Sequence, residues 1–364
     1  MPADTWANLR KSWWFPGCRG FRFTSTRRWG AVRRPPREQL AKARAARRAT
    51  QSDQDAVEIR PPAPIGVVGC GTMGRLLVQS VGSAGYRVVA YDTDIDALSA
   101  AAELGAEVAP GVRAVGERCA AVLLSLPGPR EVRAVAGELL EGRAGLVIVD
   151  TSTSDPKTTR SLARRAEAVG KYFLDAPILG RPATWGQWTV PVGGTSEGVA
   201  RARRVLEAFA ARVVPVGEAG TGHTVKLLNQ MMFAVLNAVT AEVLSTACRV
   251  GVHPEVFYEC LVTSGAATVS GLFRELGAKI ARHDFTPVFS VDLLCKDTDL
   301  AVGMARAAGA APLLTEIAQV LGHTARAQGL GELDSAAVVR VYEDLLTDGR
   351  QDPGDGHAQR DAGS

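Results

Sequence analysis

A lysine and an amide lie three positions apart in residues 220–230, which read GTGHTVKLLNQ. The apolar spacing after Thr221 predicts a long helix, so Lys226 and Asn229 share one face of that helix. An amine in this position can move a proton to or from an alcohol or carbonyl oxygen while the amide holds that oxygen in place. Taken alone, Lys226 is more simply interpreted as a surface lysine near a helix N-terminus. A second motif favours the chemical interpretation.

That second motif is a glycine-rich turn in residues 64–94, PIGVVGCGTMGRLLVQSVGSAGYRVVAYDTD. Gly69, Gly71 and Gly74 form G-x-G-x-x-G between an apolar run at 65–68 and a helical pattern. In such a turn the first glycine makes the sharp bend, the second admits a pyrophosphate and the third lets helix and strand pack closely.

The residues that follow these glycines complete a predicted dinucleotide site. Thr72 and Met73 begin the expected helix, whose N-terminal N–H groups bind phosphate. A second strand over 87–91 ends at Asp92, where an acid can accept hydrogen bonds from an adenosine ribose. Because Asp92 would repel a 2′-phosphate, we expect NAD to be preferred, with NADP as the alternative cofactor.

The chain of 364 residues is long enough for two domains, and its charge is unevenly distributed. Residues 1–50 hold 13 basic and 2 acidic residues, whereas the remainder holds 29 basic and 36 acidic residues. The mildly acidic remainder lacks the charge pattern of a nucleic-acid-binding protein. We interpret residues 1–60 as a disordered basic extension. The alternatives are a targeting peptide and a basic arm for nucleic acid or an acidic membrane.

Cysteine and histidine usage indicates the compartment and argues against a metal site. The six cysteines are scattered without a C-x-x-C pair, which predicts free thiols and a cytoplasmic protein. The five histidines show no metal-ligand spacing. No apolar run in residues 1–60 is long enough for a membrane span, and we expect no membrane association. Residues 349–364 have the composition of a disordered tail.

Strand-like and helix-like runs alternate up to about residue 216, which predicts an α/β fold with a parallel, doubly wound sheet. From Thr221 apolar residues recur at helical spacing through Val250, and no clear strand follows. We therefore expect an α/β domain over residues 61–218 and an all-helical domain over residues 219–348, joined through the long helix.

In a doubly wound sheet, ligands bind beyond the carboxyl ends of the strands. Leu126 and Pro127 follow one predicted strand, and Ser152 and Thr153 follow the next. The hydroxyls of Ser152 and Thr153 can cap the following helix or contact a cofactor, and both interpretations stay open. The loop over 175–187 and the start of the long helix complete the expected site.

These motifs resemble the β-hydroxyacid dehydrogenase family, which includes 3-hydroxyisobutyrate dehydrogenase and tartronate semialdehyde reductase. The resemblance extends from about residue 64 to 346, through GCGTMG at 69–74, LPGP at 126–129, DTST at 150–153, DAP at 175–177, VGG at 192–194, GTGHTVKLLNQ at 220–230 and FSVDLLCKDTDLA at 289–301.

The resemblance implies a Rossmann domain joined by a long helix to an all-helical domain that forms dimers or tetramers. It implies that Lys226 is the catalytic lysine and that Asn229 is its amide partner. It also implies that Thr153 and Lys296 line the cofactor and the active site.

One loop departs from the family pattern. Where the family commonly reads DAPVSGG, residues 175–181 read DAPILGR, so Leu179 replaces the serine, Arg181 replaces a glycine, and Gly180 remains. Since Leu179 cannot hydrogen-bond a carboxylate, we expect Arg181 to hold the acid group of the substrate. The alternative is a surface arginine or one beside the pyrophosphate. We expect a substrate bulkier or less polar than tartronate semialdehyde.

Three further residues near these motifs have open interpretations. Trp185 is a candidate wall of the substrate pocket, whereas Trp188 is expected in the core of a strand. His223 resembles family positions near the substrate but can equally cap the long helix.

The sequence therefore predicts hydride transfer between nicotinamide and a small, acidic substrate, a β-hydroxy acid or its semialdehyde, with Lys226 as general acid and base. Ser152, Leu179, Gly180 and Arg181 are the predicted surroundings of that substrate, together with Lys226 and Asn229. One alternative is an imine or atypical carbonyl reductase of the same fold. The other is a non-catalytic, dinucleotide-binding regulatory protein that uses its basic arm.

Overall fold

The computed structural model describes residues 58–264, 268 and 270–344, all of which belong to one compact unit, Gln54–Ser364. Nearly all of the extension at 1–60 and the whole tail at 349–364 lie outside the described residues.

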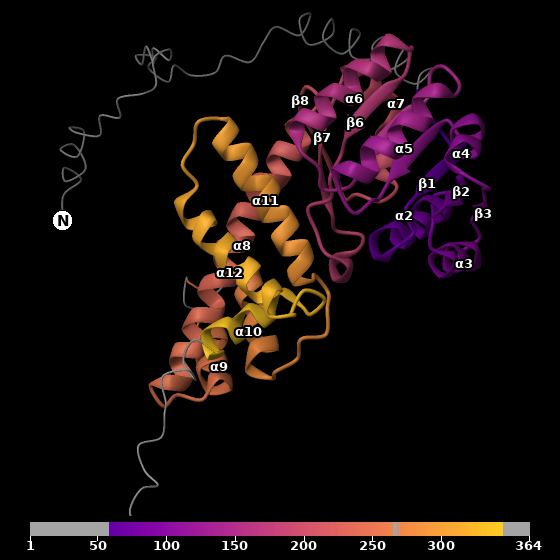
Figure 1. Ribbon diagram of the computed structural model, residues 1–364. Helices are drawn as coiled ribbons and strands as arrows, with labels where there is room; N and C mark the ends of the chain where they lie inside the picture. Colours follow the sequence, from indigo (N-terminus) through magenta and orange to yellow (C-terminus); the bar gives the residue numbers. More distant parts are fainter. Residues whose placement is uncertain (1–57, 265–267, 269, 345–364) are drawn as a thin grey trace, which may run out of the picture. The chain divides into compact units, whose positions relative to one another are not determined.

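An eight-stranded sheet forms the first part of this unit, in the order β3-β2-β1-β4-β5-β6-β7-β8 (Figure 1). The order of the first six strands is that of a doubly wound dinucleotide-binding sheet. The strands are β1 Pro64–Val68, β2 Arg87–Tyr91, β3 Glu107–Val108, β4 Ala121–Leu124, β5 Val147–Asp150, β6 Tyr172–Asp175, β7 Thr189–Gly193 and β8 Arg212–Gly217.

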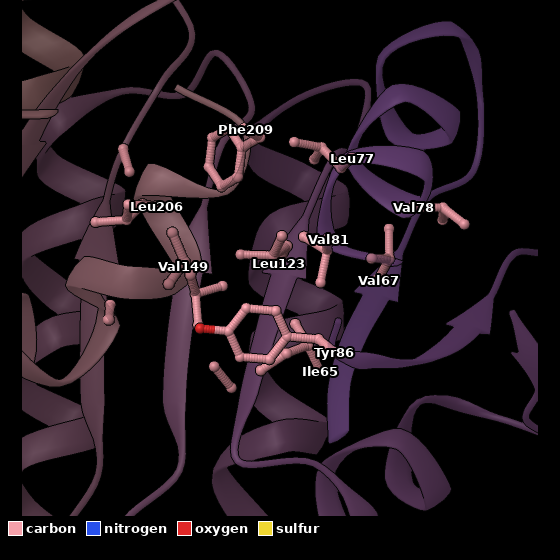
Figure 2. Close-up of a cluster of buried hydrophobic side chains, with 14 of the residues drawn as sticks. Ile65, Val67, Leu77, Val78, Val81, Tyr86, Leu123, Val149, Leu206 and Phe209 are labelled. Atoms are coloured by element: carbon pink, nitrogen blue, oxygen red, sulfur yellow. The ribbon is translucent and has the colours of Figure 1, made fainter. Parts of the chain in front are cut away.

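Two apolar cores cover the two faces of the sheet, because successive residues of a strand point to opposite faces. One core holds Ile65 and Val67 of β1 and Leu123 of β4 against Leu77 and Val81 of the first helix, as Figure 2 shows. The helices of this part are α2 Thr72–Ser83, α3 Ile95–Glu103, α4 Val112–Arg118, α5 Pro129–Glu141, α6 Pro156–Ala168 and α7 Ser196–Glu207. Helices α2, α3 and α7 contribute to this core, and α4, α5 and α6 contribute to the other.

The second part of the unit is helical and has its own apolar core. It comprises α8 Thr221–Arg249, α9 Pro254–Ser264, α10 Gly271–Ala281, α11 Val291–Ala307, α12 Leu313–Ala327, a 3₁₀ turn Ser335–Val338 and α13 Val339–Asp344. The α/β class, the long helix and the helical second half are thereby confirmed.

Helix α8 is the centre of the helical part. It has 29 residues, and an 18-residue stretch within it has a mean hydropathy of 1.5, so it could cross a membrane by length and composition alone, a test that core helices also pass. Here α8 contacts α10, α11 and α12, and buried residues recur along its whole length. Packing inside the helical part accounts for a part of its apolar composition, whereas Leu228, Met232 and Val239 remain exposed.

The predicted parallel sheet is confirmed, with one antiparallel pair of strands that the sequence did not indicate. Strand β7 runs antiparallel to β6, with Asp175 opposite Gly193, whereas the other neighbouring pairs are parallel. A parallel connection needs a crossover, usually a helix. The chain between β6 and β7 contains only the 3₁₀ turn Pro182–Thr184 and folds back on itself through a bridge between Leu179 and Thr189.

Candidate active site

The glycine turn after β1 contains three glycines with different surroundings. Gly69 has a φ of +91°, and a Cβ there would overlap the carbonyl oxygen of Ser125. A Cβ on Gly74 would overlap the carbonyl oxygen of Gly69. Gly71 is unlike both, since a Cβ there would have no atom within 4 Å. The missing side chain of Gly71 therefore leaves open space in front of α2 instead of relieving a contact inside the protein.

The N-terminus of α2 fits an anionic group in that space. Its N-cap residue is Gly71, and no side chain caps the free N–H groups of the first turn. Such N–H groups and the helix dipole favour phosphate binding. The turn therefore fits the pyrophosphate of a dinucleotide.

Asp92 lies beside this turn at the end of β2. One carboxylate oxygen accepts a hydrogen bond from Cys70 N at 2.5 Å and the other from Asp94 N at 2.9 Å. These bonds fix the orientation of the carboxylate. A carboxylate has lone pairs for about four hydrogen bonds, so Asp92 retains acceptors for ribose hydroxyls.

A cavity of about 670 Å³ lies between the carboxyl ends of the strands and helices α8, α10 and α11. Most of the predicted site residues line it, namely Thr72, Met73, Leu126, Pro127, Ser152, Thr153, Gly180, Arg181, Lys226, Asn229 and Lys296. The predicted residues outside its lining are Gly69, Gly71, Gly74, Asp92 and Leu179. The first four of these belong to the glycine turn and the end of β2, so they form a separate part of the site.

Lys226 projects from the second turn of α8 into this cavity, and its Nζ donates a hydrogen bond to the carbonyl oxygen of Ile178 at 3.0 Å. Burial lowers the pKa of the Lys226 ammonium below its usual value. The carboxylate of Asp297 opposes this effect, whereas the charges of Lys296 and Arg181 reinforce it. The amine is therefore closer to its neutral, proton-accepting form than an exposed lysine.

The sequence did not identify Gln230 and Asp297, which connect the surroundings of Lys226 to α11. Gln230 Nε2 donates to Asp297 Oδ2 at 2.5 Å, and Asn229 Nδ2 donates to Gln230 Oε1 at 3.1 Å. Lys296 Nζ lies 2.7 Å from the other oxygen of Asp297 and donates to Pro127 O at 3.0 Å. A signal for Gln230 was present, since it lies at i+4 from the lysine and thus on the same helix face.

The loop after β6 directs backbone groups at the cavity. Leu179 exchanges hydrogen bonds with Thr189, from N to O at 2.9 Å and from O to N at 3.2 Å. The carbonyl of the preceding residue, Ile178, accepts the hydrogen bond from Lys226. A Cβ on Gly180 would overlap the Trp188 ring, which accounts for glycine there. Gly180 thus lines the cavity that contains the amine.

Arg181 lines the cavity, but its charge has a partner within the protein. Its guanidinium forms an ion pair with Glu275 of α10 and lies 5.4 Å from the centroid of the Phe233 ring. Trp185 does not line the cavity and donates from Nε1 to Ser80 Oγ at 2.8 Å. Trp188 is fully buried, as expected for a core residue.

His223 is fully buried beneath the site instead of facing it. Its Nδ1 lies 2.7 Å from Thr159 Oγ1 and its Nε2 lies 3.2 Å from Ser152 O. Asp175 accepts hydrogen bonds from the N–H groups of Gly220 and His223, both at 2.8 Å, and so caps the start of α8. These bonds anchor the helix that carries Lys226 to the ends of β5 and β6.

The loop after β5 is held by buried polar groups. Ser152 Oγ accepts a hydrogen bond from Leu126 N at 2.9 Å, which ties together the loops after β4 and β5. Burial raises the pKa of the Asp150 carboxyl to about 6, and burial lowers the pKa of His223.

Within the described residues, no cluster of three or more His, Cys, Asp or Glu side chains is arranged to hold a metal ion.

Two family models match consecutive parts of the chain. The NAD binding domain of 6-phosphogluconate dehydrogenase matches residues 64–217. The NAD-binding domain of NADP-dependent 3-hydroxyisobutyrate dehydrogenase matches residues 220–342. The boundary between the two matches lies at the start of α8.

Individual relatives agree with these matches. L-threonate dehydrogenase of Cupriavidus necator is 30% identical over 293 residues, which cover 79% of this chain and 98% of the relative. 3-Hydroxyisobutyrate dehydrogenase of Pseudomonas aeruginosa is 32% identical over 292 residues, covering 76% of this chain and 98% of the relative. The crystal structure of 3-hydroxyisobutyrate dehydrogenase from Salmonella typhimurium matches with a TM-score of 0.71 at 27% identity, covering 77% of this chain and 99% of that one. The chain therefore belongs to the β-hydroxyacid dehydrogenases, as a 3-hydroxyisobutyrate dehydrogenase-like member with an NAD(P)-binding domain.

Proposed function

We propose that the protein interconverts a β-hydroxy acid and its semialdehyde or oxo acid, using NAD(P). The observation that carries this proposal is the placement of Lys226, a partly buried amine with a lowered pKa, in the cavity that Asn229 and Gly180 also line. When bound, the nicotinamide dinucleotide would supply or accept the hydride.

In the oxidative direction, neutral Lys226 takes the proton of the substrate hydroxyl as that oxygen becomes a carbonyl. In the reductive direction the ammonium returns the proton to the oxygen. Asn229 lies on the same helix face, and its side-chain amide is the proposed hydrogen-bond partner of that oxygen. Gln230 orients this amide by accepting a hydrogen bond from it. The N–H of Gly180 is the proposed donor to the substrate carboxylate.

We infer a preference for NAD over NADP from the position of Asp92. Its carboxylate is fixed at the end of β2, where a 2′-phosphate would meet a like charge. The ratio of kcat/KM for the two cofactors tests this inference, and Asp92→Ala should reduce the ratio. Equal or better use of NADP by the unaltered protein would refute it.

The reaction class is tested by turnover of a panel that includes 3-hydroxyisobutyrate, L-threonate and 2-(hydroxymethyl)glutarate, followed by nicotinamide absorbance. We expect turnover of at least one hydroxy acid, and its loss in Lys226→Ala. Turnover of imines alone would assign the protein to imine reduction. Dinucleotide binding and tight DNA binding without any turnover would indicate a regulatory protein.

A further inference from the structure

The charges that line the cavity are almost completely paired with one another. Its charged residues, among those the structure describes, are Lys226, Lys296, Arg181, Glu275 and Asp297. Arg181 is paired with Glu275, and Lys296 lies 2.7 Å from Asp297. Lys226 is the remaining cation of this set. Because Lys226 is the proposed acid and base and the other two cations are paired, the lining offers no unpaired guanidinium to a second carboxylate of a ligand.

One patch of the wall formed by the helical part is apolar. Phe233 of α8 and Phe289 pack edge to face, with ring centroids 5.2 Å apart, and Leu236 and Leu272 lie on the same wall. The Arg181 guanidinium covers the Phe233 ring, so that the ion pair with Glu275 borders this apolar surface. A substituent that buries hydrocarbon against this surface strengthens binding, whereas one that buries an unpaired polar group there weakens it.

We propose that Glu275, by pairing with Arg181, determines the specificity of the pocket and makes it select a 3-hydroxy acid with an apolar substituent over one with a second carboxylate. This inference rests on the proposed function and refines it by naming the substrate class. A second carboxylate at the substituent end would approach Glu275, a like charge, and would find the guanidinium already paired. Arg181 thus lines the substrate pocket, but its charge is paired with Glu275 and is not available to the substrate.

The substitution Glu275→Gln turns this proposal into a gain-of-function experiment. It keeps the shape of the side chain on α10 but removes its charge, so the guanidinium of Arg181 becomes available to a second carboxylate. The matched probes are 2-(hydroxymethyl)pentanoate and 2-(hydroxymethyl)glutarate, which share one carbon skeleton and differ by a terminal carboxylate. The measurement is kcat/KM for both acids, with the full chain and saturating cofactor.

We expect the unaltered protein to prefer the monocarboxylate by about 10-fold or more, the size of one charge-assisted hydrogen bond gained or lost. Glu275→Gln should raise the ratio of kcat/KM for the dicarboxylate to that for the monocarboxylate by about the same factor. Adding Arg181→Gln to Glu275→Gln should remove the part of this gain that comes from the guanidinium and leave only the part that comes from lost repulsion.

The matched control is Glu316→Gln, which breaks the ion pair of 2.8 Å between Arg306 and Glu316 outside the cavity and should leave the ranking of the two acids unaltered. A preference of the unaltered protein for the dicarboxylate, or an unchanged ranking in folded Glu275→Gln, overturns the inference while the proposed function stands. If Glu275→Gln does not fold, the double variant provides the comparison, and a ratio of the two acids equal to that of the unaltered protein overturns the inference, because the charge of Glu275 is then shown not to act on the second carboxylate. Absence of turnover of any hydroxy acid overturns the proposed function itself, and the inference with it.

Discussion

At the scale of single residues, substitutions in the glycine turn should distinguish a glycine needed for cofactor binding from one needed for stability of the fold. Gly71→Ala adds a methyl group to open space, so it should change the free energy of unfolding by no more than about 0.5 kcal/mol. It should raise the dissociation constant of the cofactor about 10-fold or more, because the methyl group occupies the approach of the pyrophosphate. Gly74→Ala overlaps the Gly69 carbonyl and should instead destabilise the fold by about 1–3 kcal/mol. Denaturant unfolding and cofactor titration distinguish the two, and equal loss of stability in both would contradict the assignment.

Lys226 gives a prediction about rate and pH. Lys226→Ala should lower kcat by about 10²-fold or more, whereas Lys157→Ala on the exposed side of α6 should not change it.

Since burial lowers the pKa of Lys226, the rate of alcohol oxidation should rise with pH and level off below the usual lysine value of 10.5, and the rate of the reverse reduction should fall over the same range. Asp297→Asn removes the charge that opposes this shift and should move the profile of kcat/KM to lower pH. Asp299→Asn, on the same helix but outside the cavity lining, is the control.

The spacing of Lys226 and Asn229 could be read from the sequence because a helix places i and i+3 together. The bond between Gln230 and Asp297 could not, since the two are 67 positions apart in the chain. The environment of Arg181 could likewise be predicted only in part. Its position in a loop after a strand predicts that it faces the site, but its pairing with Glu275 depends on where α10 packs.

At the scale of secondary-structure elements, the start of α8 sets the position of the Lys226 amine. A Cβ on Gly222 would lie 2.6 Å from Asp175 O and 2.8 Å from Pro191 O, so Gly222→Ala must shift the first turn of the helix. We expect it to lower both the free energy of unfolding and kcat. Gly303→Ala in α11 is the matched control, because a Cβ there meets no atom within 4 Å and alanine stabilises a helix interior by about 0.5–1 kcal/mol. An unaltered kcat in Gly222→Ala would show that Lys226 tolerates displacement.

The strands and helices with clear apolar periodicity could be predicted, and their direction in the sheet could not. An apolar run such as that of β7 is compatible with either direction, and only the missing crossover helix before it indicates an antiparallel pair. Strand β3 has two exposed residues and thus no apolar pattern to detect.

At the scale of the whole molecule, an exposed apolar face of α12 predicts self-association. Leu313, Ile317 and Val320 follow one another at i, i+4 and i+7 and are 68%, 61% and 64% exposed. We expect at least a dimer, in which this face is buried against a second copy. Ile317→Asp should reduce the mass measured by light scattering, whereas Gln328→Asp at the end of α12 should not. An Ile317→Asp protein of unchanged mass would place the interface elsewhere.

Removal of residues 1–57 tests the division of the chain. The sheet begins at Pro64, and the glycine turn, the cavity and all three cores are built from later residues. The truncated protein should therefore keep the melting temperature, oligomeric mass and kcat/KM of the full chain. A truncated protein that is insoluble or has lost activity would show that the extension takes part in the fold.

The anchoring of α8 at its first turn also has a consequence for how substrate can enter. At 1.5 Å per residue, the 29 residues of α8 span about 43 Å, and Lys226 lies only about 8 Å from the anchored end. A tilt of about 5° around that end displaces the far end of α8 by about 4 Å but Lys226 by less than about 1 Å. If the helical part swings outward about that end, the cavity mouth widens while the amine stays near the pivot, within reach of the same backbone groups.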